Sequence, residues 1–166
     1  MKRVVALILS ALMLTSLVGC GNDAEKDEFL KYYNEDMPAV FELDQQVYDS
    51  FTSIQEPTTK EELDALLATL AEETIPLANS HYNAAFALAA EIKNEDLLEV
   101  HKIYVDYASK METALTALMM GMTSLDMDSV AKSQEAENER NQLYLDYARS
   151  VEALAKEYGL EGVSDE

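Results

Sequence analysis

The chain has 166 residues, of which 12 are Lys or Arg and 32 are Asp or Glu, so its formal net charge is −20 at pH 7. This balance argues against nucleic acid as a partner, because phosphate recognition needs clustered basic residues, and against direct adhesion of the folded part to anionic lipid. Only one glycine, Gly121, lies between residues 22 and 158, which is too few turn residues for a sheet protein and predicts an all-α fold.

The first nineteen residues have the pattern of an export signal. Lys2 and Arg3 precede a run of apolar or weakly polar residues, 4–18, which is too short for a hydrocarbon core that needs about twenty residues. The chain then reads Leu-Val-Gly-Cys, ending at Cys20, and this order resembles the lipobox of bacterial lipoproteins. The resemblance implies cleavage before the cysteine, a diacylglycerol on its sulfur and a further acyl chain such as palmitate. The alternative is an ordinary secretory signal, or an uncleaved anchor, with a cysteine there by chance.

Cys20 is the only cysteine of the chain, so an internal disulfide is impossible, and acylation explains an otherwise free thiol. We therefore expect residues 1–19 to be a lipoprotein signal peptide and residues 20–23 to be the lipidated cysteine with a short tether. Two or three acyl chains hold a protein firmly on a membrane, which predicts a lipid-anchored protein on the extracytoplasmic face of the cell membrane. Cleavage would leave 10 basic and 32 acidic residues, a formal charge of 10 − 32 = −22.

The first helix is expected over about residues 24–55, where apolar residues recur three and four apart. Pro57 ends it. Thr59 and Glu62 then have capping-box spacing, as do the residues one position earlier, and open a second helix that we expect to end near Lys93.

Asn94 is a candidate N-cap for the third helix, which we expect to fade around residues 121–124. Either Asp126 or Asp128 can cap the fourth helix. That helix is expected to end at Tyr158, with the following glycine as its C-terminal stop.

Long helices joined by short loops predict an up-down-up-down antiparallel four-helix bundle over residues 24–160, with 161–166 as a disordered tail. Pro38 and Pro76 fall inside the first and second helices, where a proline removes a backbone hydrogen bond and bends the rod. If the turns are centred near residues 57, 94 and 125, the two prolines share a level. The sequence therefore predicts a bundle of kinked long helices.

Three short segments resemble a group of small helical lipoproteins of Gram-positive bacilli. They are Tyr33-Asn34-Glu35-Asp36-Met37-Pro38 followed by Leu43, then Thr74-Ile75-Pro76, and then Glu99-Val100-His101-Lys102-Ile103-Tyr104. With the lipobox in front, the resemblance spans most of the chain. It implies export and a helical fold, and it implies no particular reaction.

The motifs of several common active sites are absent from the sequence. Di-iron helical bundles need a Glu three residues before an inward His, but Ala78 and Leu98 stand at that distance from His81 and His101. No Gly-x-Ser-x-Gly or phosphate-binding loop occurs, and the only thiol is assigned to lipid. We therefore expect a non-enzymatic protein without a cofactor, whose two histidines are partly exposed or hydrogen-bonded.

Methionines cluster near the expected third turn, at Met119, Met120, Met122 and Met127. Thioethers outside the cytoplasm can bind Cu(I), so the first three are candidate ligands of a weak metal site. Methionine also fills irregular cores and forms adaptable contact surfaces. The cluster therefore predicts core filling, a hydrophobic contact patch or, as a third alternative, a copper site.

A short echo links the third and fourth helices. Tyr104-Val-Asp-Tyr107-Ala and Tyr144-Leu-Asp-Tyr147-Ala match at an offset of forty residues. An old helix duplication and similar packing demands both explain it.

Counting residues from the expected turns places four tyrosines at one level. Together with the proline bends, this suggests a small ligand cleft lined by tyrosine with nearby polar contacts. Its candidate residues are Tyr33, Tyr82, Tyr107, Tyr144, Asn83 and Arg140. The alternative is that the tyrosine rings pack inward and the prolines only curve the bundle.

The sequence thus predicts a lipid-anchored, extracytoplasmic helical-bundle lipoprotein that binds something at the cell envelope. An envelope protein is the expected partner, met by the distal tip of the bundle or by a helix face. The alternatives are a small-molecule or metal-binding lipoprotein, using the tyrosine-lined cleft or the methionine-rich tip, and a structural spacer.

Overall fold

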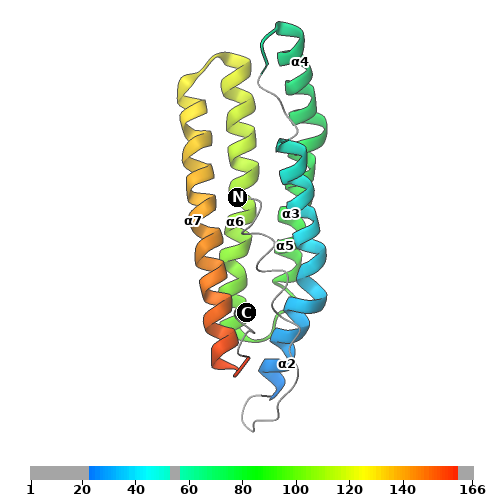
Figure 1. Cartoon of the computed structure of the whole chain (residues 1–166), viewed down its shortest axis with the longest axis vertical. Coiled ribbons are helices and arrows are strands. Elements are labelled where there is room, and N and C mark those ends of the chain that lie inside the picture. Colours follow the sequence, from blue (N-terminus) through cyan, green and yellow to red (C-terminus); the bar gives the residue numbers. More distant parts are fainter. Residues whose placement is uncertain (1–22, 53–56, 161–166) are drawn as a thin grey trace, which may run out of the picture.

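The computed structural model describes residues 23–52 and 57–160. These residues form only helices and turns, and four rods of helix pack together (Figure 1), which confirms the all-α prediction. The predicted signal peptide 1–19, Cys20 and the tail 161–166 lie outside the described residues. Among the helices described, none is long and apolar enough to cross a membrane.

The first rod consists of α2 (Asp23–Lys31), a π-helical turn η1 (Tyr32–Asp36) and α3 (Met37–Thr52). In η1 the backbone N–H of Met37 bonds to Tyr32 O, five residues back. The wider turn stands directly before Pro38, whose ring would clash with the carbonyl four residues earlier in a regular helix. The predicted single helix is therefore interrupted, and the proline supplies the reason.

The second rod repeats this arrangement with α4 (Lys60–Thr69), η2 (Leu70–Thr74) and α5 (Ile75–Leu88), where η2 stands before Pro76. The predicted capping box is confirmed: Glu62 N donates to Thr59 Oγ1 at 3.2 Å, and Thr59 N donates to Glu62 Oε2 at 3.1 Å. The rod ends at Leu88 rather than at the predicted Lys93, because the chain makes turns over residues 89–91.

The third and fourth rods are α6 (Glu95–Ser124) and α7 (Met127–Glu157), close to the predicted bounds. Their N-caps are Asn94, which accepts from Leu97 N at 3.1 Å, and Asp126. The stop after α7 is confirmed, since Gly159 has the left-handed φ of 65° that glycine readily adopts.

The two echoed motifs face each other across α6 and α7. The ring centroids of Tyr104 and Tyr147 are 4.9 Å apart, and those of Tyr107 and Tyr144 are 5.6 Å apart. In each pair the two residue numbers sum to 251. The two helices therefore have the register that a turn centred near residue 125 predicts. Similar packing demands are therefore sufficient to explain the echo.

The predicted common level of the two prolines is wrong. Ser50 Oγ lies 2.8 Å from Thr74 Oγ1, and Asp44 Oδ1 lies 3.8 Å from His81 Nδ1. In these two contacts the paired residue numbers sum to 124 and 125. At the same register Pro38 lies opposite residues near 87 of the second rod, and not opposite Pro76. The end of α3 therefore does not lie beside the start of α4, as the predicted register required, and α4 extends beyond the end of α3 (Figure 1).

The buried residues form two hydrophobic clusters. The larger contains most of the aromatic residues and involves every rod. The smaller lies between α3, α4, α5 and α6, where Met119 and Met122 pack against it. Its buried members are Val47, Leu66, Leu70, Ala78, Met111 and Leu115.

Gly121 lies where α6 packs tightly against the start of α7. A Cβ there would lie 2.7 Å from Val130 Cγ2, 3.0 Å from Val130 N and 3.1 Å from Asp126 O. Alanine normally stabilises a helix by about 1 kcal/mol over glycine, but the neighbouring backbone atoms cannot rotate away. We therefore expect Gly121→Ala to lower the free energy of unfolding by about 1–3 kcal/mol. Chemical denaturation checks this against Thr123→Ala at an exposed helical position; a variant as stable as the wild type would contradict the close approach.

Candidate functional site

A set of polar side chains, contributed by every rod, lies inside the larger hydrophobic cluster. One of them, Tyr32, is followed by Tyr33, and both are buried, because the π-helical turn directs adjacent residues inward. Only Asp44 retains appreciable solvent exposure. We call this set the polar layer. It consists of Tyr32, Asp44, His81, His101, Tyr104, Tyr107, Arg140 and Tyr147.

His101 anchors the first hydrogen-bonded chain. Its Nε2 lies 2.7 Å from the carbonyl oxygen of Ala85, in the last turn of α5, so Nε2 carries the proton and donates. In a neutral ring Nδ1 must then accept, and Tyr32 OH donates to it at 2.9 Å. Tyr147 OH lies 3.1 Å from Tyr32 OH and is left as the donor to it. The chain therefore runs Tyr147 to Tyr32 to His101 to Ala85, with every proton assigned.

His81 anchors the second chain. Its Nε2 lies 3.0 Å from Tyr104 OH, and its Nδ1 faces Asp44 Oδ1 at 3.8 Å. Nδ1 has no hydrogen-bonding partner within the described residues. If Nδ1 were unprotonated, its lone pair would face a carboxylate, so the favoured tautomer carries the proton on Nδ1 and accepts from Tyr104 at Nε2. This is the Asp-His-hydroxyl order of a catalytic triad, but its hydroxyl is a phenol that is fully buried.

Tyr107 connects Asp44 to Arg140. The phenol donates to the Asp44 carboxylate at 2.8 and 2.9 Å, and Arg140 Nη2 donates to the phenol oxygen at 2.8 Å. The Arg140 guanidinium also lies over the Tyr107 ring, 4.8 Å from its centroid, and Nη1 binds Glu137 at 3.0 Å. A buried arginine thus has anionic and aromatic partners, as such a charge requires.

Burial dominates the protonation of these groups. It lowers the pKa of both histidines, a shift that Asp44 opposes and Arg140 reinforces at His81, and that the Ala85 hydrogen bond opposes at His101. Burial also raises the pKa of the phenols of Tyr32, Tyr104 and Tyr147 well above 10. The polar layer is therefore neutral at its histidines and tyrosines, and its charges are those of Asp44 and Arg140.

The two histidines predict a loss of stability in mild acid. In the unfolded chain each binds a proton near pH 6.5, whereas the folded pKa values lie lower. Stability is therefore complete above about pH 6.5 and falls below it, by up to about 1.4 kcal/mol per pH unit for each histidine, until the folded pKa is reached. Denaturation curves at pH 7.5 and 5.5 measure the effect. His101→Gln should reduce the slope, and equal stability at both pH values would contradict the assignment.

The structure brings together only part of the predicted tyrosine cleft. Tyr107, Tyr144 and Arg140 are in contact through the Tyr107 ring and hydroxyl. Of the other three candidates, Tyr33 packs between Phe29 and Phe41 and lies near enough to Tyr144 for the two phenols to interact electrostatically. Tyr82 packs against Phe86, and Asn83 is exposed on α5.

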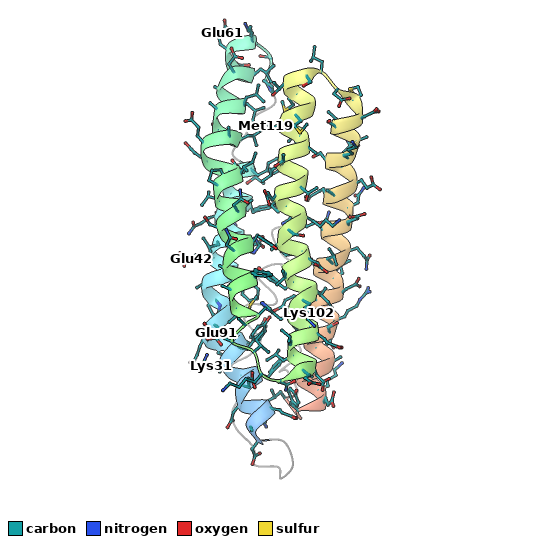
Figure 2. The ribbon with its side chains drawn as sticks, turned by 180° about the vertical axis from the view of Figure 1, so that it is seen from behind. Lys31, Glu42, Glu61, Glu91, Lys102 and Met119 are labelled. Carbon is teal, nitrogen blue, oxygen red and sulfur yellow. The ribbon has the colours of Figure 1, made fainter. Side chains whose placement is uncertain are left out.

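A surface pocket of about 360 Å³ lies at a different place, where α2 and η1 meet the end of α5. None of the predicted cleft residues lines it. Figure 2 shows two residues of its wall, Lys31 and Glu91, at the end of the molecule opposite Glu61 and Met119. The pocket is lined by Asp27, Glu28, Lys31, Tyr32, Asp36, Leu88, Glu91, Ile92 and Lys93.

The methionines divide between two environments. Met119 and Met122 are half-buried against the smaller hydrophobic cluster, whereas Met120 is exposed. A site made of these three sulfurs would therefore require side chains to leave the core. In the described part of the chain, no group of three His, Cys, Asp or Glu side chains is placed to hold a metal ion.

Sequence reasoning missed the polar layer itself. Both histidines are completely buried rather than partly exposed, although the predicted hydrogen bonding is confirmed. The available signal was two histidines and a row of tyrosines at core positions of a helical pattern. Chemically, the arrangement holds protons at defined atoms and excludes water.

Comparisons with known protein families, curated proteins and solved structures found no match.

Proposed function

We propose that this chain is a lipid-anchored, extracytoplasmic, non-enzymatic protein that binds a partner protein at the cell envelope. Acylated Cys20, three residues before α2, would hold the α2 end of the bundle near the membrane. The proposal includes an up-down-up-down order of the rods and bending of the first two at their π-helical turns. It also includes a tip, formed by the α6–α7 turn, that points away from the membrane.

The observation that carries the proposal is the exposure of apolar side chains at this tip. Leu125 is 85% exposed, Met127 is 74% exposed and Met120 is 55% exposed. Figure 1 shows the α6–α7 turn at the opposite end of the molecule from α2. Exposed apolar groups that lie together, especially with methionine, are typical of adaptable contact surfaces.

The backbone of Leu125 adds a second argument. Its φ is 53°, the left-handed conformation in which a leucine costs about 1 kcal/mol or more and glycine costs little. At this position a leucine therefore stabilises the fold no more than a glycine would. Selection for binding accounts for its presence better than selection for stability does.

Leu125→Gly separates these two roles. We expect the variant to be at least as stable as the wild type and to lose its partner. A photo-crosslinking residue at position 127, in the full chain in native membranes, should give one defined adduct that Leu125→Gly abolishes. Leu145 is also exposed but lies on α7 away from the turn, so the same crosslinker there is the matched control. An adduct unchanged by Leu125→Gly, or equal at both positions, would contradict the proposal.

The anchor is tested separately by the intact mass of the membrane-extracted protein. We expect a chain that begins at Cys20 with added acyl groups, and we expect Cys20→Ala to remain unacylated. An unmodified chain in the wild type would remove the lipid anchor from the proposal while leaving the tip to be tested in solution.

A second candidate function is small-molecule binding, which the pocket at the α2 end favours. Its volume of about 360 Å³ is within the range of ligand pockets. Its wall combines apolar Leu88 and Ile92 with charged side chains. Saturable binding of a small molecule that Ile92→Glu abolishes and Leu125→Gly leaves intact would favour this alternative.

A copper site at the methionines would instead require binding of Cu(I) that is lost in Met120→Leu.

A further inference from the structure

Tyr104 differs from the other buried phenols because its proton acceptor, the imidazole of His81, itself faces a carboxylate. The phenol and the His81 ring are both fully buried, and their hydrogen bond measures 3.0 Å. The rings meet edge to face, with centroids 5.7 Å apart. On the far side of the imidazole, the Asp44 carboxylate lies 3.8 Å from Nδ1. A phenol, a base and a counter-charge are thus held in line by α6, α5 and α3.

The composition of the chain directs oxidation toward tyrosine. It contains nine tyrosines, no tryptophan and one cysteine, which the proposed anchor acylates. Tryptophan and free thiols are the side chains that compete most effectively with tyrosine as one-electron donors. A one-electron oxidant that meets the folded domain therefore draws its electron from tyrosine.

Loss of an electron makes a phenol strongly acidic, so a buried tyrosine is oxidised readily only when a base accepts its proton. His81 is suited to this role because burial keeps its ring neutral before the reaction. The resulting imidazolium would be buried, and a buried charge needs a partner of opposite sign. Asp44 provides it at 3.8 Å, where the attraction is strong in an environment of low dielectric constant.

We propose that Tyr104 is a site of reversible one-electron oxidation, with His81 as its proton acceptor and Asp44 as the carboxylate that stabilises the imidazolium. A one-electron oxidant of the peroxyl-radical class takes one electron from Tyr104 and becomes the corresponding anion. The phenolic O–H bond breaks, an N–H bond forms at His81 Nε2, and the products are a neutral phenoxyl radical and an imidazolium. A one-electron reductant of the ascorbate class returns the electron, the proton moves back from His81 Nε2 to the phenoxyl oxygen, and Tyr104 is restored.

A row of aromatic rings connects this site to the surface. Tyr144 is only half-buried, and its ring centroid lies 5.6 Å from that of Tyr107. Tyr107 in turn lies 5.3 Å from Tyr104. Oxidised Tyr144 releases its proton to solvent and regains one when it takes an electron from Tyr107, whose own proton moves to the Asp44 carboxylate. An electron from Tyr104 and the proton held by Asp44 then restore Tyr107, so the oxidising equivalent moves inward. There it is shielded from solvent and from other radicals.

The chain offers an internal comparison in Tyr32 and His101. Their hydrogen bond is equally short, at 2.9 Å, but the other ring nitrogen of His101 donates to a neutral carbonyl, Ala85 O. No carboxylate of the described residues is paired with this ring. An imidazolium is therefore less stabilised here, and of the two phenols that are bonded to a histidine, Tyr104 is the preferred site.

Flash photolysis tests the proposal on the full chain purified in detergent, with tris(bipyridine)ruthenium(III) as the oxidant. We expect electron paramagnetic resonance to detect a neutral tyrosyl radical whose formation is slower in deuterated water. Tyr104→Phe should remove most of the signal. His81→Gln should slow its formation by about 100-fold, which is the contribution of a positioned base, and Asp44→Asn should slow it less. Tyr82→Phe, at a half-buried tyrosine outside the row, should change nothing.

Every result of the flash-photolysis experiment either supports or overturns the proposal. A radical of equal yield and rate in Tyr104→Phe would overturn the assignment, since oxidation would then fall on other tyrosines. Equal rates in His81→Gln and the wild type would overturn the role of the base. If His81→Gln does not fold, as judged by circular dichroism, then Asp44→Asn takes its place, and an unchanged rate in that variant would overturn the proposal.

Discussion

Above about pH 10 this protein is expected to unfold in one cooperative step, with the release of several tyrosine protons at once. The cause is the set of phenols in the core. Tyr32, Tyr104, Tyr107 and Tyr147 are each at most 4% exposed, and burial raises the pKa of each of them. A less deeply placed neighbour, Tyr33, has its pKa raised to about 12 by the same cause.

The direction and size of the effect follow from linkage. Below pH 10 the phenols keep their protons in both the folded and the unfolded state, so they do not change the stability. Above it the unfolded chain loses them while the folded core does not, and stability falls with rising pH. Each phenol contributes up to about 1.4 kcal/mol per pH unit, so the four contribute about 5.5 kcal/mol per unit. This is comparable to the whole stability of a typical domain, about 5–15 kcal/mol.

Two signals measured in one pH titration check the prediction. Tyrosinate absorbance should rise in two phases, and the second should coincide with the loss of helix in far-ultraviolet circular dichroism. Tyr147→Phe should make the fall in stability less steep, because it removes one of the buried phenols whose pKa burial raises. A single tyrosinate transition near pH 10 with the helices intact would show that the phenols are accessible, against the structure.

The helix ends of this protein could be predicted because they depend on residues close together in the chain. Thr59 with Glu62, Asn94, Asp126 and Gly159 all act within a few positions of the helix that they begin or end. The all-α fold followed from an equally simple feature, the scarcity of glycine. Neither inference required knowledge of how the rods pack.

The polar layer could not be predicted, because it depends on the register between rods. For α6 and α7 a short turn sets the register, and the expected pairing of Tyr107 with Tyr144 is observed. For the first two rods the sequence indicated a turn near Pro57, but the observed pairing is displaced by several residues. As a result, Asp44 rather than Tyr33 faces Tyr107. The π-helical turns add to the displacement, since each inserts a residue that helical periodicity does not reveal.

Register also suggests what the polar layer does for the fold. An apolar core tolerates sliding of one rod against another, whereas a network of directed hydrogen bonds is satisfied at one alignment. In this protein the hydrogen bonds of the polar layer join side chains from all four rods, each through a defined pair of atoms. The bonded pairs are Tyr32 with His101 and with Tyr147, His81 with Tyr104, and Tyr107 with Asp44 and with Arg140. The network is therefore expected to determine which alignment forms, and its loss should be felt beyond the residues removed.

Arg140→Met is expected to be the most damaging single change in this network, lowering the free energy of unfolding by about 3 kcal/mol or more. Methionine fills similar space but donates nothing. The Tyr107 oxygen loses its donor at 2.8 Å, and the Asp44 carboxylate loses a positive charge 3.8 Å away. Arg140→Lys should restore only part of the loss, because one ammonium cannot serve both Tyr107 and Glu137 as the planar guanidinium does.

Arg149→Met provides the matched control. The Arg149 side chain is 72% exposed, and its ion pair with Asp146 measures 3.6 Å within the same helix. Such a surface pair contributes about 0–1 kcal/mol, so this variant should be nearly as stable as the wild type. A double-mutant cycle with Asp44→Asn should show a coupling to Arg140 of at least about 0.5 kcal/mol, because both groups share Tyr107. Equal losses for the two arginines would mean that Arg140 is held at the surface rather than in the network.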